Sequence, residues 1–269
     1  MSPSLPRQFP VEFVYQLFAL LVAIVLVHAV YVGLIRPQAA AALALQAQTL
    51  AADPSAITER STWVVLKDAE QEICFILMFW GMAIIGYKAR QVIDERRAFA
   101  TELLQVPEGQ SLLPEDARQY ARAIEALPVA ARERLLPEAL LTALQRFRST
   151  RSIQDVAVAV DQVCESRTDR LDSELSMIRY IAWAIPSIGF IGTVRGIGDA
   201  LGMAHQAVEG DITGVTAALG VAFNSTLIAL ILSIILMFFL HQLQLMQERL
   251  VIETRRYCDR RLIQHLQAP

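Results

Sequence analysis

Residues 215–240 read VTAALGVAFNSTLIALILSIILMFFL and contain no Asp, Glu, Lys or Arg. A helix that crosses a bilayer needs about 20 mostly apolar residues, because the hydrocarbon core is about 30 Å thick and a helix rises about 1.5 Å per residue. This stretch meets both requirements. It therefore predicts a membrane-spanning helix, and it makes the chain an integral membrane protein in the lipid bilayer.

Three further stretches are apolar enough to span a membrane, namely residues 13–35, 73–87 and 181–204. The second is short, and apolar residues 63–66 extend it beyond a charged patch. The composition agrees with this division, because 54% of the 269 residues are hydrophobic while the 19% that are charged gather between the apolar stretches. We expect an all-α protein with four transmembrane helices.

Basic residues flank these stretches unequally. They follow the second and fourth spans, at Lys88, Arg90, Arg96, Arg97, Arg249, Arg255, Arg256, Arg260 and Arg261, whereas residues 205–214 contain no Lys or Arg. Since loops rich in Lys and Arg stay in the cytoplasm, both termini are predicted to be cytoplasmic. Residues 36–72 and 205–214 then form outer (periplasmic) loops. Residues 88–180 form a helical cytoplasmic domain that continues into the third span, and residues 241–269 form a cytoplasmic helical tail.

Several function classes lack support in the sequence. The net charge is −3 and no basic stripe appears, so nucleic acid is not an expected partner. Cys74, Cys164 and Cys258 lie far apart without a CxxC pair, so we expect neither a metal site nor a disulfide framework. No phosphate-binding loop, zinc-protease motif or catalytic triad spacing occurs, so we expect no cofactor and no enzymatic activity.

The third span carries an unusual pattern of small residues. Residues 184–201 read AIPSIGFIGTVRGIGDAL, and Pro186, Gly189, Thr193 and Gly196 fall on one helical face by their spacing. Small residues let helices approach closely inside a membrane. A matching small and hydroxylated stripe lies on the fourth span, and the residues expected to pack the two helices together are Pro186, Gly189, Gly192, Gly196, Ala222 and Ala229.

Two threonines in these stripes are expected to lie at similar depth. Thr193 lies about 12 residues, or about 18 Å, from the cytoplasmic start of its span, and Thr226 lies about 11 residues, or about 17 Å, from the outer start of the antiparallel fourth span. Both hydroxyls then lie close to the middle of the bilayer. With Ser225 they are candidate ion-path residues. The alternative is that they bond to their own helix or hold the two helices together.

The segments IPSIGFIGTVRGI and AFNSTLIAL, one helix apart, resemble the MotA/TolQ/ExbB proton channel family. The resemblance covers residues 175–245, and four spans with a large loop after the second resemble MotA more than TolQ or ExbB. It implies a ring of five copies around a dimer of a single-span MotB/TolR/ExbD-like partner in the bacterial inner membrane. The complex would be a motor driven by proton flow, in some members sodium flow, with Thr193 and Thr226 lining the ion path.

The spans themselves hold no Asp or Glu near the middle of the membrane, so the partner is expected to supply a membrane Asp. Asp199 is the one acid of the third span and lies close to its outer end. Arg195, four residues earlier, is expected to form an ion pair with Asp199 at the outer mouth. Alternatively, Arg195 steers ions or contacts the partner's carboxylate.

Two other functions stay open at this stage. In the first, the chain is a non-conducting scaffold whose glycine-rich helices only assemble a ring. In the second, it is an ion channel that works without a partner. A neighbouring gene for a single-span protein with a membrane Asp would favour the motor.

Overall fold

The computed structural model describes residues 11–53, 61–100, 103–104 and 111–267, which form helices and connecting segments without a β-strand. The helices are α1 (Val11–Val30), α2 (Arg36–Ala52), α3 (Thr62–Leu66), α4 (Ala69–Arg96), α5 (Ala117–Glu125), α6 (Val129–Arg132), α7 (Leu135–Thr150), α8 (Ile153–Glu174), α9 (Ser176–Gly202), α10 (Ala204–Val208) and α11 (Thr213–Arg261). Four helical stretches are long and apolar enough to cross a membrane, namely Val11–Ala52, Ala69–Phe99, Ile153–Gly202 and Thr213–His265. The predictions of an all-α fold and of four spans are confirmed.

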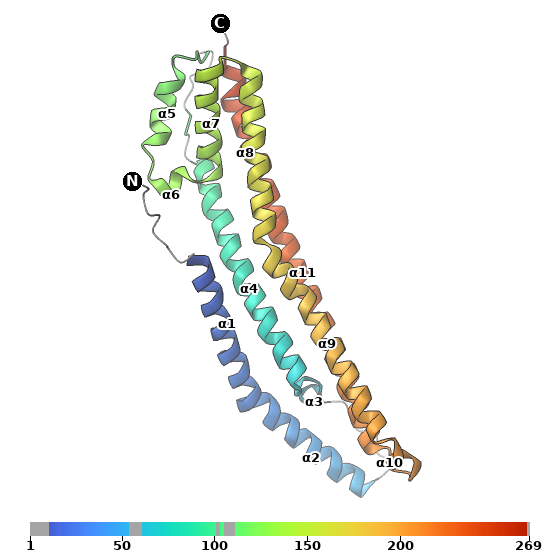
Figure 1. The fold of residues 1–269 in the computed structure, drawn as a ribbon. Coiled ribbons are helices and arrows are strands. Elements are labelled where there is room, and N and C mark those ends of the chain that lie inside the picture. The colour runs from blue at the N-terminus through green and yellow to red at the C-terminus, as the bar shows by residue number, and fades with distance from the viewer. Residues whose placement is uncertain (1–10, 54–60, 101–102, 105–110, 268–269) are drawn as a thin grey trace, which may run out of the picture. The chain divides into compact units, whose positions relative to one another are not determined.

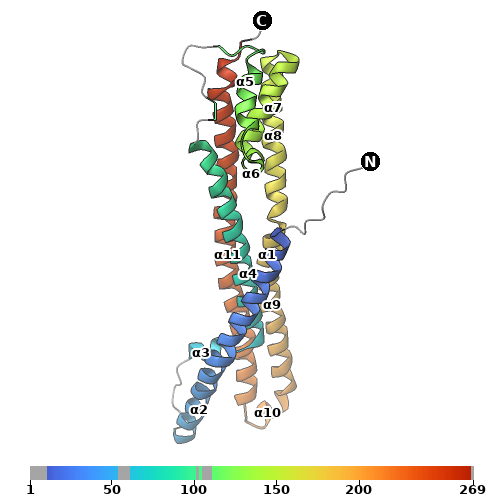
Figure 2. The same cartoon turned by 90° about the vertical axis from the view of Figure 1, so that its left-hand side faces the viewer.

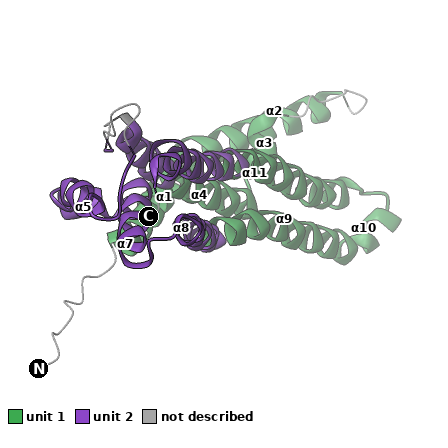
Figure 3. Cartoon of the chain, turned by 90° about the horizontal axis from the view of Figure 1, so that it is seen from above, with its two compact units in different colours: residues 1–85, 177–240 green, residues 86–176, 241–269 purple. Residues whose placement is uncertain are grey.

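The chain divides into two compact units, which Figure 3 colours separately. Unit 1 comprises residues 1–85 and 177–240, and unit 2 comprises residues 86–176 and 241–269. The apolar parts of the four long helical stretches belong to unit 1, and α5 to α8 belong to unit 2.

Within unit 1, α4 lies between α1 on one side and α9 and α11 on the other (Figures 1 and 2). Trp80 of α4 donates a hydrogen bond from its indole nitrogen to the carbonyl of Gln16 in α1, at 2.9 Å. On the other side, the Cys74 thiol donates to the carbonyl of Ile185 in α9, at 3.6 Å. These two bonds pair the polar ends of Trp80 and Cys74 with backbone oxygens of the neighbouring helices.

The first span continues into α2 through a π-helical turn, Tyr31–Ile35. Pro37 has no N–H, so the carbonyl of Gly33, four residues earlier, loses its usual helical donor. The N–H of Arg36 instead donates to the carbonyl of Tyr31, five residues back. The helical stretch bends at this turn (Figure 1), so much of the region predicted as an outer loop is helical.

Helix α4 begins at Ala69, four residues before the apolar stretch that the sequence marks. Its first turn is polar but buried, with Glu70, Gln71 and Glu72 all at most 9% exposed. Glu72 forms an ion pair with Arg36 at 2.6 Å, and its other carboxylate oxygen is hydrogen-bonded to Nδ1 of His28, also at 2.6 Å. Hydropathy alone assigns such residues to a loop, because it cannot register partners on other helices.

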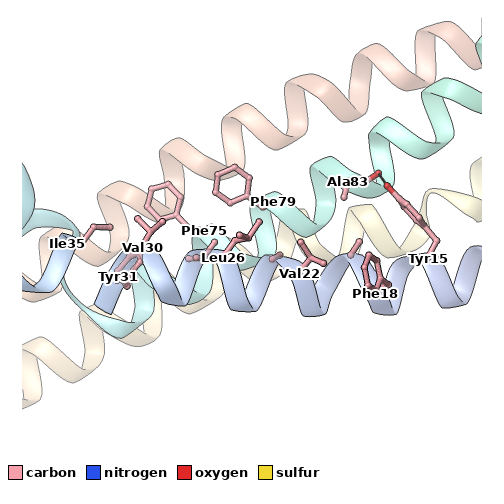
Figure 4. A pocket seen from close by; sticks show the side chains of 13 residues that line it. Tyr15, Phe18, Val22, Leu26, Val30, Tyr31, Ile35, Phe75, Phe79 and Ala83 are labelled. Carbon is pink, nitrogen blue, oxygen red and sulfur yellow. Dashed lines mark hydrogen bonds between the residues drawn. The ribbon is translucent and has the colours of Figure 1, made fainter. Parts of the chain in front are cut away.

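An open apolar groove of about 610 Å³ runs between α1 and α4 (Figure 4). Its lining side chains include Phe18, Val22, Leu26, Phe75 and Phe79. At one end of the groove, the Tyr15 hydroxyl donates a hydrogen bond to the carbonyl of Ala83, at 3.2 Å. The groove presents almost only hydrocarbon, so it offers an ion no ligand, and the candidate site lies on the opposite face of α4.

Unit 2 has its own core, built around α7. Leu140, Leu144 and Phe147 of α7 are fully buried, as are Val156 and Cys164 of α8. Ion pairs tie the unit together, joining Lys88 to Glu174, Arg96 to Glu253, Arg167 to Glu95 and Arg255 to Asp161. A backbone bridge between Leu112 and Leu266 fixes the segment before α5 to the C-terminal segment. Only Leu175 separates α8 from α9.

Candidate functional site

The side chains of Thr193 in α9 and Thr226 in α11 meet, and their hydroxyl oxygens are hydrogen-bonded to each other. Three more contacts surround the pair. The Thr193 hydroxyl lies 3.2 Å from the carbonyl oxygens of Gly189 and Ala222, and the Thr226 hydroxyl lies 3.2 Å from that of Gly189. Each hydroxyl has one proton to donate, so two protons are shared among more acceptors than they can serve at once.

This surplus of acceptors permits two directions of hydrogen bonding. In one, Thr193 donates to Thr226 and Thr226 donates to the Gly189 carbonyl. In the other, Thr226 donates to Thr193 and Thr193 donates to the carbonyl of Gly189 or Ala222. The pair is therefore fully bonded in either direction, and it can reverse without any movement of the helices.

The two hydroxyls can meet because α9 and α11 approach closely. A Cβ atom added at Gly196 would lie 2.7 Å from the carbonyl oxygen of Ala218 and 2.8 Å from the Cβ of Ala222. One added at Gly189 would collide with the Cβ of Ala229. These glycines and alanines lie along the line of contact between α9 and α11, hereafter the α9–α11 seam, as the small-residue pattern predicts.

Pro186 lies inside α9, in its N-terminal half. Its missing N–H leaves the carbonyl of Ala182 without a donor from its own helix. Ser233 of α11 donates to that carbonyl at 3.1 Å. Pro186 thus contributes to the seam through a backbone group that it leaves free.

Ser225 is buried and lies beside Thr226, next to Gly192. Its hydroxyl donates to the carbonyl of Val221 in the preceding turn, at 2.9 Å. A Cβ at Gly192 would lie 2.6 Å from the Ser225 hydroxyl oxygen, so this glycine makes room for it. The predicted ion-path residues are thus close together, although Ser225 bonds to its own helix.

The structure pairs Arg195 with Glu70 of α4 instead of Asp199. The contact is bidentate, with Nε to Oε1 at 2.7 Å and Nη2 to Oε2 at 2.8 Å. Asp199 is exposed, and among the described residues no ion pair joins it to Arg195. The physical reason is that a solvated i,i+4 pair gains little, whereas a largely buried carboxylate needs a matching cation.

Glu70 is the functional candidate that sequence reasoning missed. Its side chain is 12% exposed, and its Cγ lies 3.1 Å from where a Cβ of Gly192 would be, one residue from Thr193. The predicted spans hold no acid near the middle of the membrane, and Glu70 lies before the span predicted at residues 73–87. Acids at positions 68, 70 and 72, directly before an apolar helix, are the feature of the sequence that could have indicated it.

Asp68 precedes α4 and lies close to the same cluster. Burial raises the pKa of its carboxyl above the ordinary value, although Lys67 and Arg195 act in the opposite direction. The charged groups here are the carboxylates of Asp68 and Glu70, the ammonium of Lys67 and the guanidinium of Arg195. Within the described ranges, no group of three His, Cys, Asp or Glu side chains is arranged to hold a metal ion.

Comparison with known proteins adds one finding that covers this region. Residues 131–256 match the MotA/TolQ/ExbB proton channel family, and the matched segment contains Gly192, Thr193 and Thr226. The resemblance predicted from the two glycine- and threonine-containing segments is confirmed. No curated protein and no solved structure matches the chain.

Proposed function

We propose that this chain, which belongs to the MotA/TolQ/ExbB proton channel family through residues 131–256, is the channel-lining subunit of a motor complex driven by an ion-motive force, with the proton as the ion. The chain is a multi-pass membrane protein with four helical stretches able to cross a bilayer. In the proposal it lies in the bacterial inner membrane with both termini in the cytoplasm.

The observation that carries this proposal is the contact between Thr193 and Thr226. A chain of hydroxyls that passes a proton ends with its hydrogen bonds reversed, and it must return to its first direction before the next proton arrives. The carbonyls of Gly189 and Ala222 offer acceptors for both directions. The pair therefore has the hydrogen-bonding capacity that a proton path requires.

We further propose an assembly of five copies around a dimer of a single-span MotB/TolR/ExbD-like protein that carries a membrane Asp. Large apolar side chains on α9 and α11 point away from this chain's own helices. They include Phe190, Val194, Phe223, Leu227 and Ile234. Lipid, further copies of the chain and a partner helix are the surroundings that suit such faces in a bilayer.

The first experiment is the intact mass of the complex, purified gently from its native membranes by a tag on this chain. A ring of five copies with two copies of a single-span, carboxylate-bearing protein is the expected result. A ring that contains only this chain would favour an autonomous channel or a scaffold.

The second experiment measures proton flux in vesicles that contain the purified complex. Thr193→Val and Thr226→Val keep the shape of the side chain and remove the hydroxyl, and Thr→Ser at each position is the matched control. We expect the Val variants to lower the flux by about tenfold or more and the Ser variants to retain most of it. Unchanged flux in both Val variants would rule out the hydroxyl pair as the path.

A non-conducting scaffold is the second candidate function. It is favoured by the fact that both hydroxyls already have backbone acceptors in the seam, which is how polar side chains hold membrane helices together. A scaffold predicts that wild-type vesicles show no flux and that the Val variants mainly weaken the ring.

A further inference from the structure

Glu70 and Ser225 occupy one small space, which Gly192 leaves open. A Cβ at Gly192 would lie 3.1 Å from Cγ of Glu70 and 2.6 Å from the hydroxyl oxygen of Ser225. Glu70 belongs to α4, Gly192 to α9 and Ser225 to α11. Three helices thus bring the side chain of Glu70 next to Gly192 and Ser225, the sequence neighbours of Thr193 and Thr226.

The cation that neutralises Glu70 is held on a flexible side chain. Arg195 reaches Glu70 from the next turn of α9, and its side chain is 48% exposed, whereas that of Glu70 is 12% exposed. The guanidinium can therefore withdraw toward the side of α9 that this chain's own helices leave uncovered, as long basic side chains do at membrane interfaces. The carboxylate cannot follow, and a buried carboxylate without a partner strongly favours another cation.

The other charged and titratable groups near Glu70 are Lys67, Asp68 and Cys74, and Lys67 acts on the carboxyl of Asp68. Asp68 lies close by and is itself an acid, and Cys74 is one turn further along α4. From α11 the neighbour is Ser225, which is neutral. Arg195 is thus the cation that directly contacts Glu70.

We propose that Glu70 is an ion-binding carboxylate of the channel itself, and that Arg195 is a tethered counter-cation which the transported ion displaces. This inference rests on the proposed function, and it adds a titratable group supplied by this chain to the one expected from the partner. In the proton case an O–H bond forms on Glu70 and the ion pair with Arg195 opens. When that bond breaks and the proton passes on, the ion pair re-forms.

The test compares flux through vesicles containing the purified complex, driven by an imposed pH gradient or by a sodium gradient. Glu70→Gln should lower the flux by about tenfold or more. Glu72→Gln is the matched control, because Glu72 is equally buried two residues away and pairs with Arg36 on the other side of α4. It should leave the flux unchanged.

The double variant Glu70→Gln with Arg195→Gln decides between two explanations of a loss. If Glu70 only neutralises Arg195, removing both charges restores the flux, and the proposal is overturned. If Glu70 binds the ion, the double variant conducts as poorly as Glu70→Gln alone. Conduction by wild type and Glu70→Gln alike would overturn this inference alone, whereas no conduction by wild type would overturn the proposed function.

A second measurement does not depend on flux or on full assembly of the variants. N,N′-dicyclohexylcarbodiimide is an apolar reagent that adds to protonated carboxyl groups, and mass spectrometry locates the adduct. We expect Glu70 to react faster in Arg195→Gln than in wild type, and sodium to protect it if sodium is the ion. Equal reaction rates in the two proteins would contradict the role assigned to Arg195.

Discussion

Ser233 of α11 donates a hydrogen bond to the carbonyl oxygen of Ala182 in α9, at 3.1 Å. Ala182 lies four residues before Pro186, which has no N–H to donate to it. The neighbouring helix therefore supplies the donor that α9 lacks. Hydrocarbon contains no water to take that place, so the bond ties the two helices together at the point where α9 is weakest.

Replacing this donor should destabilise the membrane unit only while the proline is present. Ser233→Ala is expected to lower the free energy of unfolding by about 1 kcal/mol, because it leaves a buried carbonyl unpaired. In a Pro186→Ala background the N–H of residue 186 can donate to Ala182, and the effect of Ser233→Ala should shrink. A double-mutant cycle on thermal unfolding in detergent measures this coupling. An equal cost in both backgrounds would contradict it.

Because α9 and α11 approach closely, we expect different effects of alanine at two glycines of α9 that lie two residues apart. A Cβ at Gly196 would lie 2.7 Å from backbone atoms of α11, whereas one at Gly198 meets nothing within 4 Å. Gly196→Ala should therefore lower stability by about 1–3 kcal/mol. Gly198→Ala should raise it by about 0.5–1 kcal/mol, because alanine loses less backbone entropy in a helix. The unfolding midpoints of the two variants should move in opposite directions from that of the wild type.

The contact between α9 and α11 and the threonine pair could be predicted from the sequence, because the residues that form them follow a regular spacing within two short segments. Small residues recur at helical spacing in residues 184–201, and a second small stripe lies one helix later, so two antiparallel helices of similar length bring Thr193 and Thr226 to one level. The structure also places the helix-packing residues along that seam.

The ion pair between Arg195 and Glu70 could not be predicted in this way. The rule for neighbours on one helix points to Asp199, whereas the actual partner is 125 residues away in sequence. The polar start of α4 also lowers the local hydropathy, so a hydropathy profile places the start of the span after Glu70. Both the partner of Arg195 and the start of α4 depend on a contact between separate helices. A short segment of sequence does not show such a contact.

The buried thiols of unit 2 give a prediction about their chemical reactivity. Burial raises the pKa of Cys258 to about 12, with the nearby Cys164 thiol adding to the effect. The thiolate is the reactive form, so Cys258 should not be alkylated by iodoacetamide at pH 8 in the folded protein. Mass spectrometry should show modification only after denaturation. A cysteine introduced at the exposed Ser149 is the positive control, and rapid alkylation of Cys258 alongside it would show that unit 2 opens readily.

The last prediction concerns the ion pair between Lys88 and Glu174, whose atoms Nζ and Oε2 are 2.7 Å apart. Lys88 is fully buried, so Lys88→Met should leave Glu174 poorly compensated and lower the free energy of unfolding by about 3 kcal/mol. Arg170 also contacts Glu174 but is mostly exposed, so Arg170→Ala should cost less than about 1 kcal/mol. Similar losses in the two variants would contradict this assignment.

The same pair sets a dependence on pH. Burial alone would raise the pKa of Glu174, but the hydrogen bonds and charges of Lys88 and Arg170 hold it below its ordinary value of 4.5. A carboxyl whose pKa is lower in the folded state contributes stability above its unfolded pKa and loses it as the pH falls through the folded pKa. The unfolding midpoint of the wild type should therefore decrease as the pH drops below about 4.5. Glu174→Gln should remove part of that decrease, and identical pH profiles would show that another carboxyl is responsible.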